Sequence, residues 1–163
     1  MTFSAAVLTI SDAGAAGDRE DTSGPAIREI LESLGIQIAR AAVIPDSQTE
    51  IEQRLREWSD DAAIALIVTT GGTGLGPRDV TPEAMKEVLQ YEVPGMAEAM
   101  RAEGLKHTPM SMLSRAMVGV RNTTLIVNLP GSPKGVRENL AVLLPVLIHA
   151  LELLAGERSD HSS

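Results

Sequence analysis

Residues 66–82 read LIVTTGGTGLGPRDVTP, and this stretch decides the fold. It opens with an apolar, β-branched run at Leu66 to Thr70, which is typical of a strand buried on both faces. Three glycines among four residues follow, and then a helix start in which Thr81 suits the N-cap and Pro82 the first helical position. A strand, a glycine-rich turn and a helix predict a parallel α/β unit whose turn can approach an anion closely.

The glycine turn matches neither of two familiar nucleotide motifs. No Lys-Ser or Lys-Thr follows the glycines, which excludes a nucleotide-hydrolysing P-loop, and the third glycine of a dinucleotide fingerprint is misplaced. A tight turn needed only for chain geometry is the structural alternative. Asp79 favours a binding role, because a carboxylate beside a phosphate site repels the anion unless a cation such as Mg²⁺ lies between them.

Length and composition restrict the possible functions. The 163 residues, 44% of them hydrophobic, suit a single domain over residues 1–156, and residues 157–163 form a polar tail that we expect to be disordered. A net charge of −8 and only 2% aromatic residues argue against binding to nucleic acid or to acidic membranes. The absence of cysteine excludes thiolate metal sites and a cysteine nucleophile. No apolar run reaches transmembrane length and no signal peptide is evident, so we expect a cytoplasmic protein without a membrane partner.

Strand and helix patterns alternate along the chain. The expected strands are residues 5–10, 36–44, 63–69, 116–120 and 124–128. The expected helices begin at Ser23, at the capping box Ser47 to Glu50, at Thr81, at Met96 and shortly after Pro133, and Pro145 should bend the last of them. This alternation predicts a three-layer α/β fold with a mainly parallel sheet and helices on both faces.

Polar turns follow four of the expected strands. They are Ser11-Asp12, Pro45-Asp46, residues 71–79 and Gly131-Ser132. The carboxyl ends of parallel strands lie at one edge of a sheet, where ligands bind, so these turns should converge on one pocket.

Taken together, these turns resemble the molybdopterin adenylyltransferase family of molybdenum-cofactor biosynthesis, which includes homologous domains of fused plant and animal proteins. The matching segments are TISD at 9–12, DTSGP at 21–25, PD at 45–46, TTGGTG at 69–74, RDVTP at 78–82 and NLPGSPK at 128–134. They occur in the family's order over about residues 5–155, and the ordered set is far more specific than any single segment.

The resemblance implies that the terminal phosphate of molybdopterin attacks the α-phosphate of Mg-ATP, giving adenylylated molybdopterin and pyrophosphate. It implies Asp46 and Asp79 as the catalytic residues and as those directed at Mg²⁺. Contacts to substrate or phosphate are expected from Ser11, Asp12, Gly71, Gly72, Thr73, Gly74, Gly131 and Ser132. A homotrimer is also implied, with Met96, Met100, Met110 and Met112 as candidate contact residues, and a molybdenum-insertion enzyme is a candidate downstream partner.

Each polar candidate also has a structural alternative. Those alternatives are an Asx turn for Asp12, a favourable charge at a helix N-terminus for Asp46, a helix cap for Asp79, an exposed salt bridge for Arg78, a solvated helix start for Lys134 and a solvated loop for residues 18–21.

Three other functions compete with adenylyl transfer. A module that only binds molybdopterin has no need of two acids beside an anion. Molybdate insertion is disfavoured for a lone domain of this length, and a competence- or nicotinamide-related role is disfavoured because no second hydrolase domain is present.

Overall fold

The computed structural model describes residues 2–157. Its elements in chain order are β1 (Ser4–Ile10), α1 (Asp12–Ala15), α2 (Ser23–Ser33), β2 (Gln37–Ile44), α3 (Gln48–Asp60), β3 (Ile64–Thr70), α4 (Thr81–Val88), β4 (Tyr91–Glu92), α5 (Pro94–Gly104), the 3₁₀ helix η1 (Pro109–Leu113), β5 (Val118–Arg121), β6 (Thr124–Leu129) and α6 (Pro133–Leu154). The tail expected at residues 157–163 lies outside the described residues apart from Glu157.

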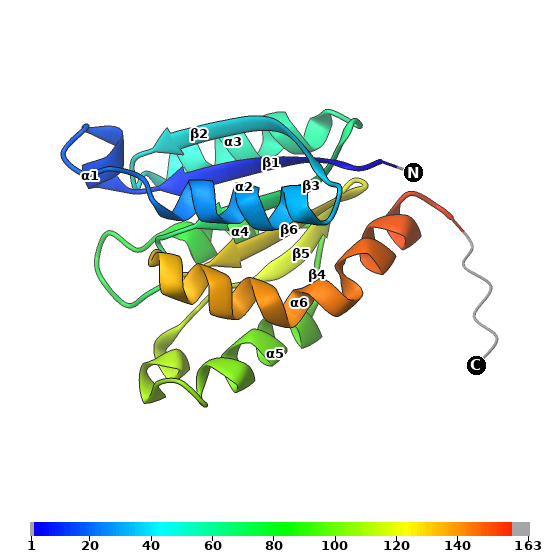
Figure 1. The fold of residues 1–163 in the computed structure, drawn as a ribbon. Helices are drawn as coiled ribbons and strands as arrows, with labels where there is room; N and C mark the ends of the chain where they lie inside the picture. The colour runs from blue at the N-terminus through cyan, green and yellow to red at the C-terminus, as the bar shows by residue number, and fades with distance from the viewer. Residues whose placement is uncertain (1, 158–163) are drawn as a thin grey trace.

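One six-stranded sheet forms the centre of the molecule, in the order β2-β1-β3-β6-β5-β4 (Figure 1). The strands β2, β1, β3 and β6 are parallel to their neighbours, whereas β5 runs antiparallel to both β6 and β4. The mainly parallel α/β fold predicted from the sequence is therefore confirmed.

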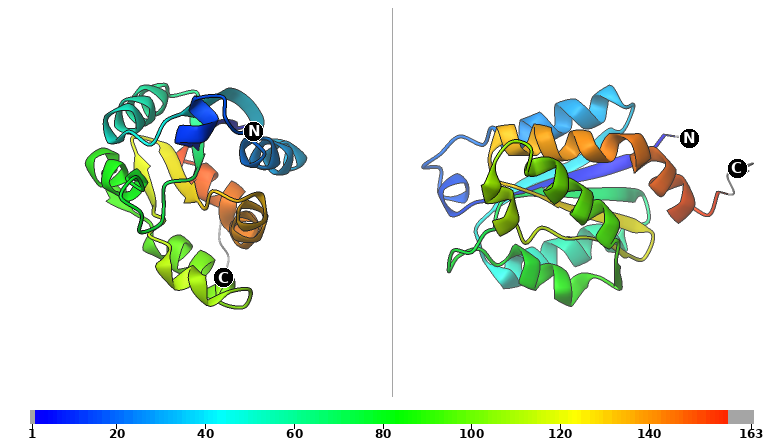
Figure 2. Two further views of the ribbon diagram at one scale, coloured as in Figure 1. Left: turned by 90° about the vertical axis from the view of Figure 1, so that its left-hand side faces the viewer. Right: turned by 90° about the horizontal axis from the view of Figure 1, so that it is seen from below.

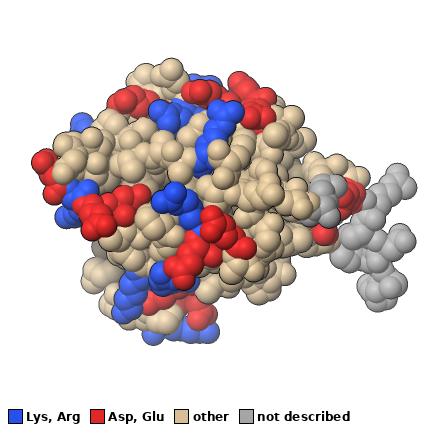
Figure 3. Space-filling view, turned by 45° about the horizontal axis from the view of Figure 1, so that its top comes forward, with Lys and Arg blue, Asp and Glu red and all other residues tan. Residues whose placement is uncertain are grey.

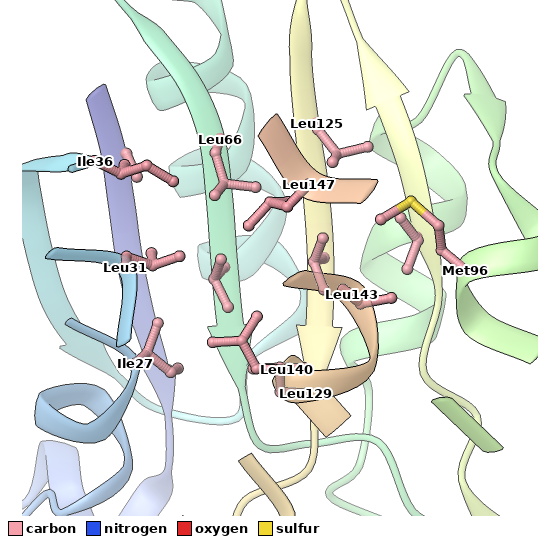
Figure 4. Packing of buried hydrophobic residues seen from close by; sticks show 14 of the residues in the cluster. Ile27, Leu31, Ile36, Leu66, Met96, Leu125, Leu129, Leu140, Leu143 and Leu147 are labelled. Carbon is pink, nitrogen blue, oxygen red and sulfur yellow. The ribbon is translucent and has the colours of Figure 1, made fainter. Parts of the chain in front are cut away.

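Helices cover both faces of the sheet (Figure 2). On one face α2, α5 and α6 bury Ile27, Met100 and a leucine stripe of α6, and Figure 4 shows residues of this cluster against Leu66 and Leu125 of the strands. On the other face, α3 and α4 pack their apolar side chains against the alternate residues of the same strands. Strands buried on both faces explain why β1, β3 and β6 are continuous apolar runs.

The long helix α6 contains Pro145 and bends along its length in Figure 1, as the sequence predicted. Its buried residues repeat at helical spacing on the face toward the sheet. They are Val136, Leu140, Leu143, Leu147 and Leu151.

Two predicted helix caps are wrong. Ser23 and Thr81 are the first residues of their helices rather than N-caps, and neither helix has a side-chain cap from its N-cap residue. Both hydroxyl groups instead donate to distant carbonyl groups, Ser23 to Gly131 (2.6 Å) and Thr81 to Gly71 (3.0 Å). The third expected cap is confirmed, because Ser47 accepts the Glu50 N–H at the start of α3.

The expectation that Met96 and Met100 lie on a contact surface is wrong for this chain. Met96 is 9% exposed and Met100 2% exposed, and both belong to the core beneath α5 (Figure 4 shows Met96). Met110 and Met112, on η1, are 63% and 67% exposed and remain candidates for contact with another molecule.

Candidate functional site

The four polar turns converge on one edge of the sheet, at the carboxyl ends of β1, β2, β3 and β6 (left side of Figure 1). They surround a cleft of about 420 Å³. Of the residues predicted from the sequence, Ser11, Asp46, Gly71, Gly72, Asp79, Gly131 and Ser132 line this cleft.

Asp12 and Asp46 hold each other across two turns. The Asp12 N–H donates to Asp46 Oδ2 (2.9 Å), and the Asp46 N–H donates to Asp12 Oδ1 (3.0 Å). Arg78 adds a two-pronged ion pair, with its Nε and Nη2 each 3.0 Å from an Asp12 oxygen. Asp12 therefore forms no Asx turn, and Arg78 makes the salt bridge that was one of its two alternatives. Together they join the turns that carry Asp46 and Asp79.

The electrostatic surroundings of Asp12 and Asp46 shift their pKa values in opposite directions. The hydrogen bonds from Arg78 hold the pKa of the exposed Asp12 below its ordinary value. Burial raises the pKa of Asp46, and the negative charges of Asp12 and Asp79 raise it further. The cleft thus disfavours a negative charge on Asp46 in the absence of a cation.

This raised pKa predicts a pH-dependent effect of Asp46→Asn on stability in metal-free buffer. Because the folded protein disfavours ionised Asp46, this residue's contribution to stability falls as the pH rises from its ordinary pKa through the raised folded value. The Asn variant should therefore melt above the wild type at pH 7, with a smaller difference at pH 4. Calorimetry with EDTA present checks this.

Asp60→Asn serves as the control of opposite sign. Hydrogen bonding from Arg121 lowers the pKa of Asp60, so its contribution to stability is present at neutral pH and lost as the pH falls. The Asp60 variant should melt below the wild type at pH 7. A lower melting temperature for Asp46→Asn at pH 7 would contradict the account.

Asp79 lies within the glycine loop and does not cap α4. Its Oδ2 accepts the Gly76 N–H (2.8 Å), while Val80 is the N-cap residue of α4. A Cβ added at Gly74 or at Gly76 would lie 2.9 Å from that same oxygen. These two glycines therefore make room for a carboxylate of the protein itself, which the sequence analysis did not predict.

The first two glycines of the loop have backbones that other residues cannot easily adopt. Gly71 has φ of 104° and Gly72 has φ of 71°. A Cβ at Gly71 would meet the Ile10 carbonyl oxygen at 2.2 Å, and one at Gly72 would meet Thr81 Oγ1 at 2.2 Å. The turn thus brings its backbone close to β1 and α4, and the Gly72 N–H donates no hydrogen bond within residues 2–157.

A second hollow of about 460 Å³ adjoins the cleft, and Ser132 lines both. Thr73 and Gly74 face this second hollow rather than the cleft, which separates them from the other predicted site residues. Its remaining lining residues include Leu113, Pro130, Lys134 and Asn139. Lys134 is largely exposed, with its Nζ 3.9 Å from Glu138 Oε1.

Residues 18–21 were expected to be a solvated loop, and this is wrong for Asp21. Its carboxylate accepts the Gly24 N–H (3.0 Å) and the Thr9 hydroxyl (2.9 Å), so it fixes the start of α2 against β1. An acidic residue three positions before a helical glycine is the sequence signal that could have predicted this. Asp21, Ser23 and Arg19 also line the cleft.

The acidic side chains of the cleft fit a magnesium ion that is shared with phosphate groups. Within residues 2–157, no three His, Asp or Glu side chains come together to form a complete metal site. Mg²⁺ is usually held by one or two carboxylates together with substrate phosphates and water. Asp46 Oδ1 and Asp79 Oδ1 accept no hydrogen bond from the described residues, which leaves one oxygen of each acid for a cation.

The surface gives no sign of a nucleic-acid or membrane interface. Figure 3 shows acidic and basic residues interspersed over the face in view, without a continuous basic patch. No helix in residues 2–157 is long and apolar enough to span a membrane.

Comparison with known proteins agrees with this geometry. Residues 6–149 match the family described as "Probable molybdopterin binding domain". A molybdopterin adenylyltransferase of Helicobacter pylori is 41% identical over 158 residues, covering 96% of this chain and 90% of that protein. Gephyrin of Dictyostelium discoideum is 44% identical over 158 residues, covering 91% of this chain and 22% of that much longer protein.

Solved structures give the same result. The crystal structure of the molybdopterin biosynthesis enzyme MoaB of Thermus thermophilus superposes with a TM-score of 0.89 at 53% identity, covering 95% of this chain and 98% of that chain. The chain therefore belongs to the family of probable molybdopterin-binding domains.

Proposed function

We propose that this protein transfers the adenylyl group of ATP to molybdopterin. A terminal phosphate oxygen of molybdopterin forms a bond to the α-phosphorus of ATP, and the bond between that phosphorus and the α,β-bridging oxygen breaks. Pyrophosphate leaves with the electron pair of that bond, and adenylylated molybdopterin is the product. Relatives named molybdopterin adenylyltransferase that align over nearly the whole chain support this assignment.

The observation that carries the proposal is the arrangement of Asp46 and Asp79 in a single cleft. They come from turns after different strands, and each leaves one carboxylate oxygen without a hydrogen bond from the described residues. Two such acids beside anionic substrates require a cation, and Mg²⁺ supplies positive charge to the phosphate oxygens when it is bound. Asp46 and Asp79 are the residues that hold it.

The rest of the cleft serves to bind and orient phosphate. The Gly72 N–H is available to a ligand oxygen, and Ser132 stands between the cleft and the adjoining hollow. The polar cleft takes the phosphate chain, and the adjoining hollow takes one of the two ring systems of the substrates. Transfer between two bound phosphates depends mainly on position and charge neutralisation, which suits a chain that has no cysteine nucleophile.

A protein that only binds molybdopterin is the second candidate, and the family description by itself fits it. The two candidates are separated by incubating the protein with molybdopterin, ATP and Mg²⁺ and analysing the pterin by mass spectrometry. Adenylyl transfer predicts a pterin heavier by one AMP unit that accumulates over many turnovers. Saturable pterin binding without this product would favour the binding module.

We also propose that the protein assembles as a homotrimer. The exposed Met110, Met112 and Leu113 of η1 provide an apolar surface that a second copy can cover. Light scattering coupled to gel filtration should give about three times the mass of one chain at micromolar concentration, and Met112→Glu should lower that mass. A clean monomer for the wild type would overturn both the trimer and this surface.

A further inference from the structure

Arg115, which the sequence analysis did not single out, lies between η1 and β5 and contacts the glycine loop from the side of the sheet's antiparallel edge. Its backbone N–H donates to the Thr73 carbonyl oxygen (2.8 Å), and its Nε donates to that of Gly74 (2.9 Å). Its Nη2 donates to the carbonyl oxygen of Asp79 (2.8 Å). One residue therefore binds both ends of the loop that contains Asp79.

The guanidinium group is itself held in place. Nη1 of Arg115 lies 2.5 Å from Glu83 Oε1, in the first turn of α4, and the Arg115 side chain is 33% exposed. The other Glu83 oxygen is buried and has no hydrogen bond within residues 2–157. A planar guanidinium that makes several directed hydrogen bonds fixes its partners more narrowly than a lysine ammonium group can.

The loop has few other constraints. Residues 75–78 are exposed and belong to no helix or strand. Besides the Arg115 contacts, the loop is held by the reciprocal hydrogen bonds between Gly76 and Asp79 and by the exposed ion pair between Arg78 and Asp12. Removing Arg115 would leave the Gly74 and Asp79 carbonyl groups without their side-chain donor.

We infer that Arg115 is a positioning residue that fixes the Asp79 carboxylate in the cleft. It touches the backbone of Asp79 and not the cleft itself, since it is not among the cleft's lining residues. The inference rests on the proposed adenylyl transfer for its kinetic consequence, and on the loop contacts alone for its structural consequence. Misplacing a catalytic group by about 1 Å can cost roughly 100-fold in rate, which is the size of effect expected here.

Arg121 offers a matched control at the opposite edge of the sheet. Its Nη1 lies 2.5 Å from Asp60 Oδ1 and donates to Ser59 Oγ (2.9 Å), and its side chain is 20% exposed. Arg121→Ala thus removes a comparable set of contacts without touching the glycine loop. Both alanine variants should lose stability, and only Arg115→Ala should disturb the site.

The kinetic test compares Arg115→Ala, Arg115→Lys and Arg121→Ala at a temperature where all three are folded. We expect kcat to fall by roughly 30- to 100-fold in Arg115→Ala, with KM for molybdopterin changed less than about threefold. Arg115→Lys should keep the charge but lose the fork, and should remain at least roughly tenfold impaired. Millimolar guanidinium should partly restore Arg115→Ala. A purely structural role predicts a lower melting temperature with kcat unchanged in all variants, and this would overturn the inference.

Hydrogen–deuterium exchange gives a readout independent of activity. Amides of residues 73–80 should exchange roughly tenfold faster in Arg115→Ala than in the wild type, with no such change in Arg121→Ala. If the wild type makes no adenylylated product, the proposed function fails while the exchange result still decides whether Arg115 fixes the loop. Unchanged exchange in Arg115→Ala and in Arg115→Lys would overturn the positioning role, whatever the activity.

Discussion

Replacing Asp79 with Asn should lower the rate of adenylylation by roughly two orders of magnitude or more, a loss of about 3 kcal/mol in transition-state stabilisation. The substitution keeps the size of the side chain and an oxygen that can accept the Gly76 N–H, so the loop should keep its shape. It removes the negative charge directed at Mg²⁺ and thus leaves the charge on the transferring group poorly balanced. Molybdopterin should bind as well as before or more tightly, because one negative charge near an anionic ligand is gone.

Product formation, pterin affinity and melting temperature measured on one preparation separate this result from a structural role. Asp46→Asn should behave in the same way, and Asp18→Asn, an exposed acid that does not line the cleft, should match the wild type. A structural role for Asp79 predicts about 1 kcal/mol of lost stability with turnover hardly changed. Full activity in both Asp46 and Asp79 variants would favour the binding module.

Gly71→Ala should be the most destabilising single substitution in the glycine turn. A residue with a side chain at φ of 104° is strained, and its Cβ would lie 2.2 Å from the Ile10 carbonyl oxygen, a backbone atom that cannot move without displacing β1. The two effects together should cost about 3 kcal/mol or more, which corresponds to a fall in melting temperature of roughly 6–12 °C for a chain of this size.

Gly35→Ala isolates the backbone effect. Gly35 has φ of 80°, and a Cβ added there would have no atom within 4 Å beyond its chain neighbours, so this variant should lose only about 1 kcal/mol. The difference in melting temperature between the two variants measures the close approach of the turn to β1. Equal melting temperatures would contradict the packing described for Gly71.

Apolar patterns allowed most of the fold to be predicted, because strands covered on both faces must be apolar along their length. The runs that became β1, β3 and β6 could therefore be recognised within one or two residues of their observed ends. The two-residue strand β4 and the short helix α1 were missed. Both depend on contacts with distant residues, as in the pairing of Tyr91 with Val120, and short segments carry little periodicity of their own.

The polar candidates show a different limit. Their convergence on one edge follows from parallel topology, but their partners do not. Ser23 and Thr81 read as caps in the local sequence and instead bind carbonyl groups 108 and 10 residues away. Arg115 was invisible for the same reason, since nothing near it in sequence indicates the loop that it holds.

The most direct test of adenylyl transfer follows the label of ATP that is radioactive at either the α- or the γ-phosphate. With molybdopterin and Mg²⁺ present, the account predicts that α-label appears in the pterin product and γ-label appears in pyrophosphate, at equal rates, and that Asp79→Asn loses both. Release of γ-label as inorganic phosphate, or a pterin that never acquires α-label, would contradict it.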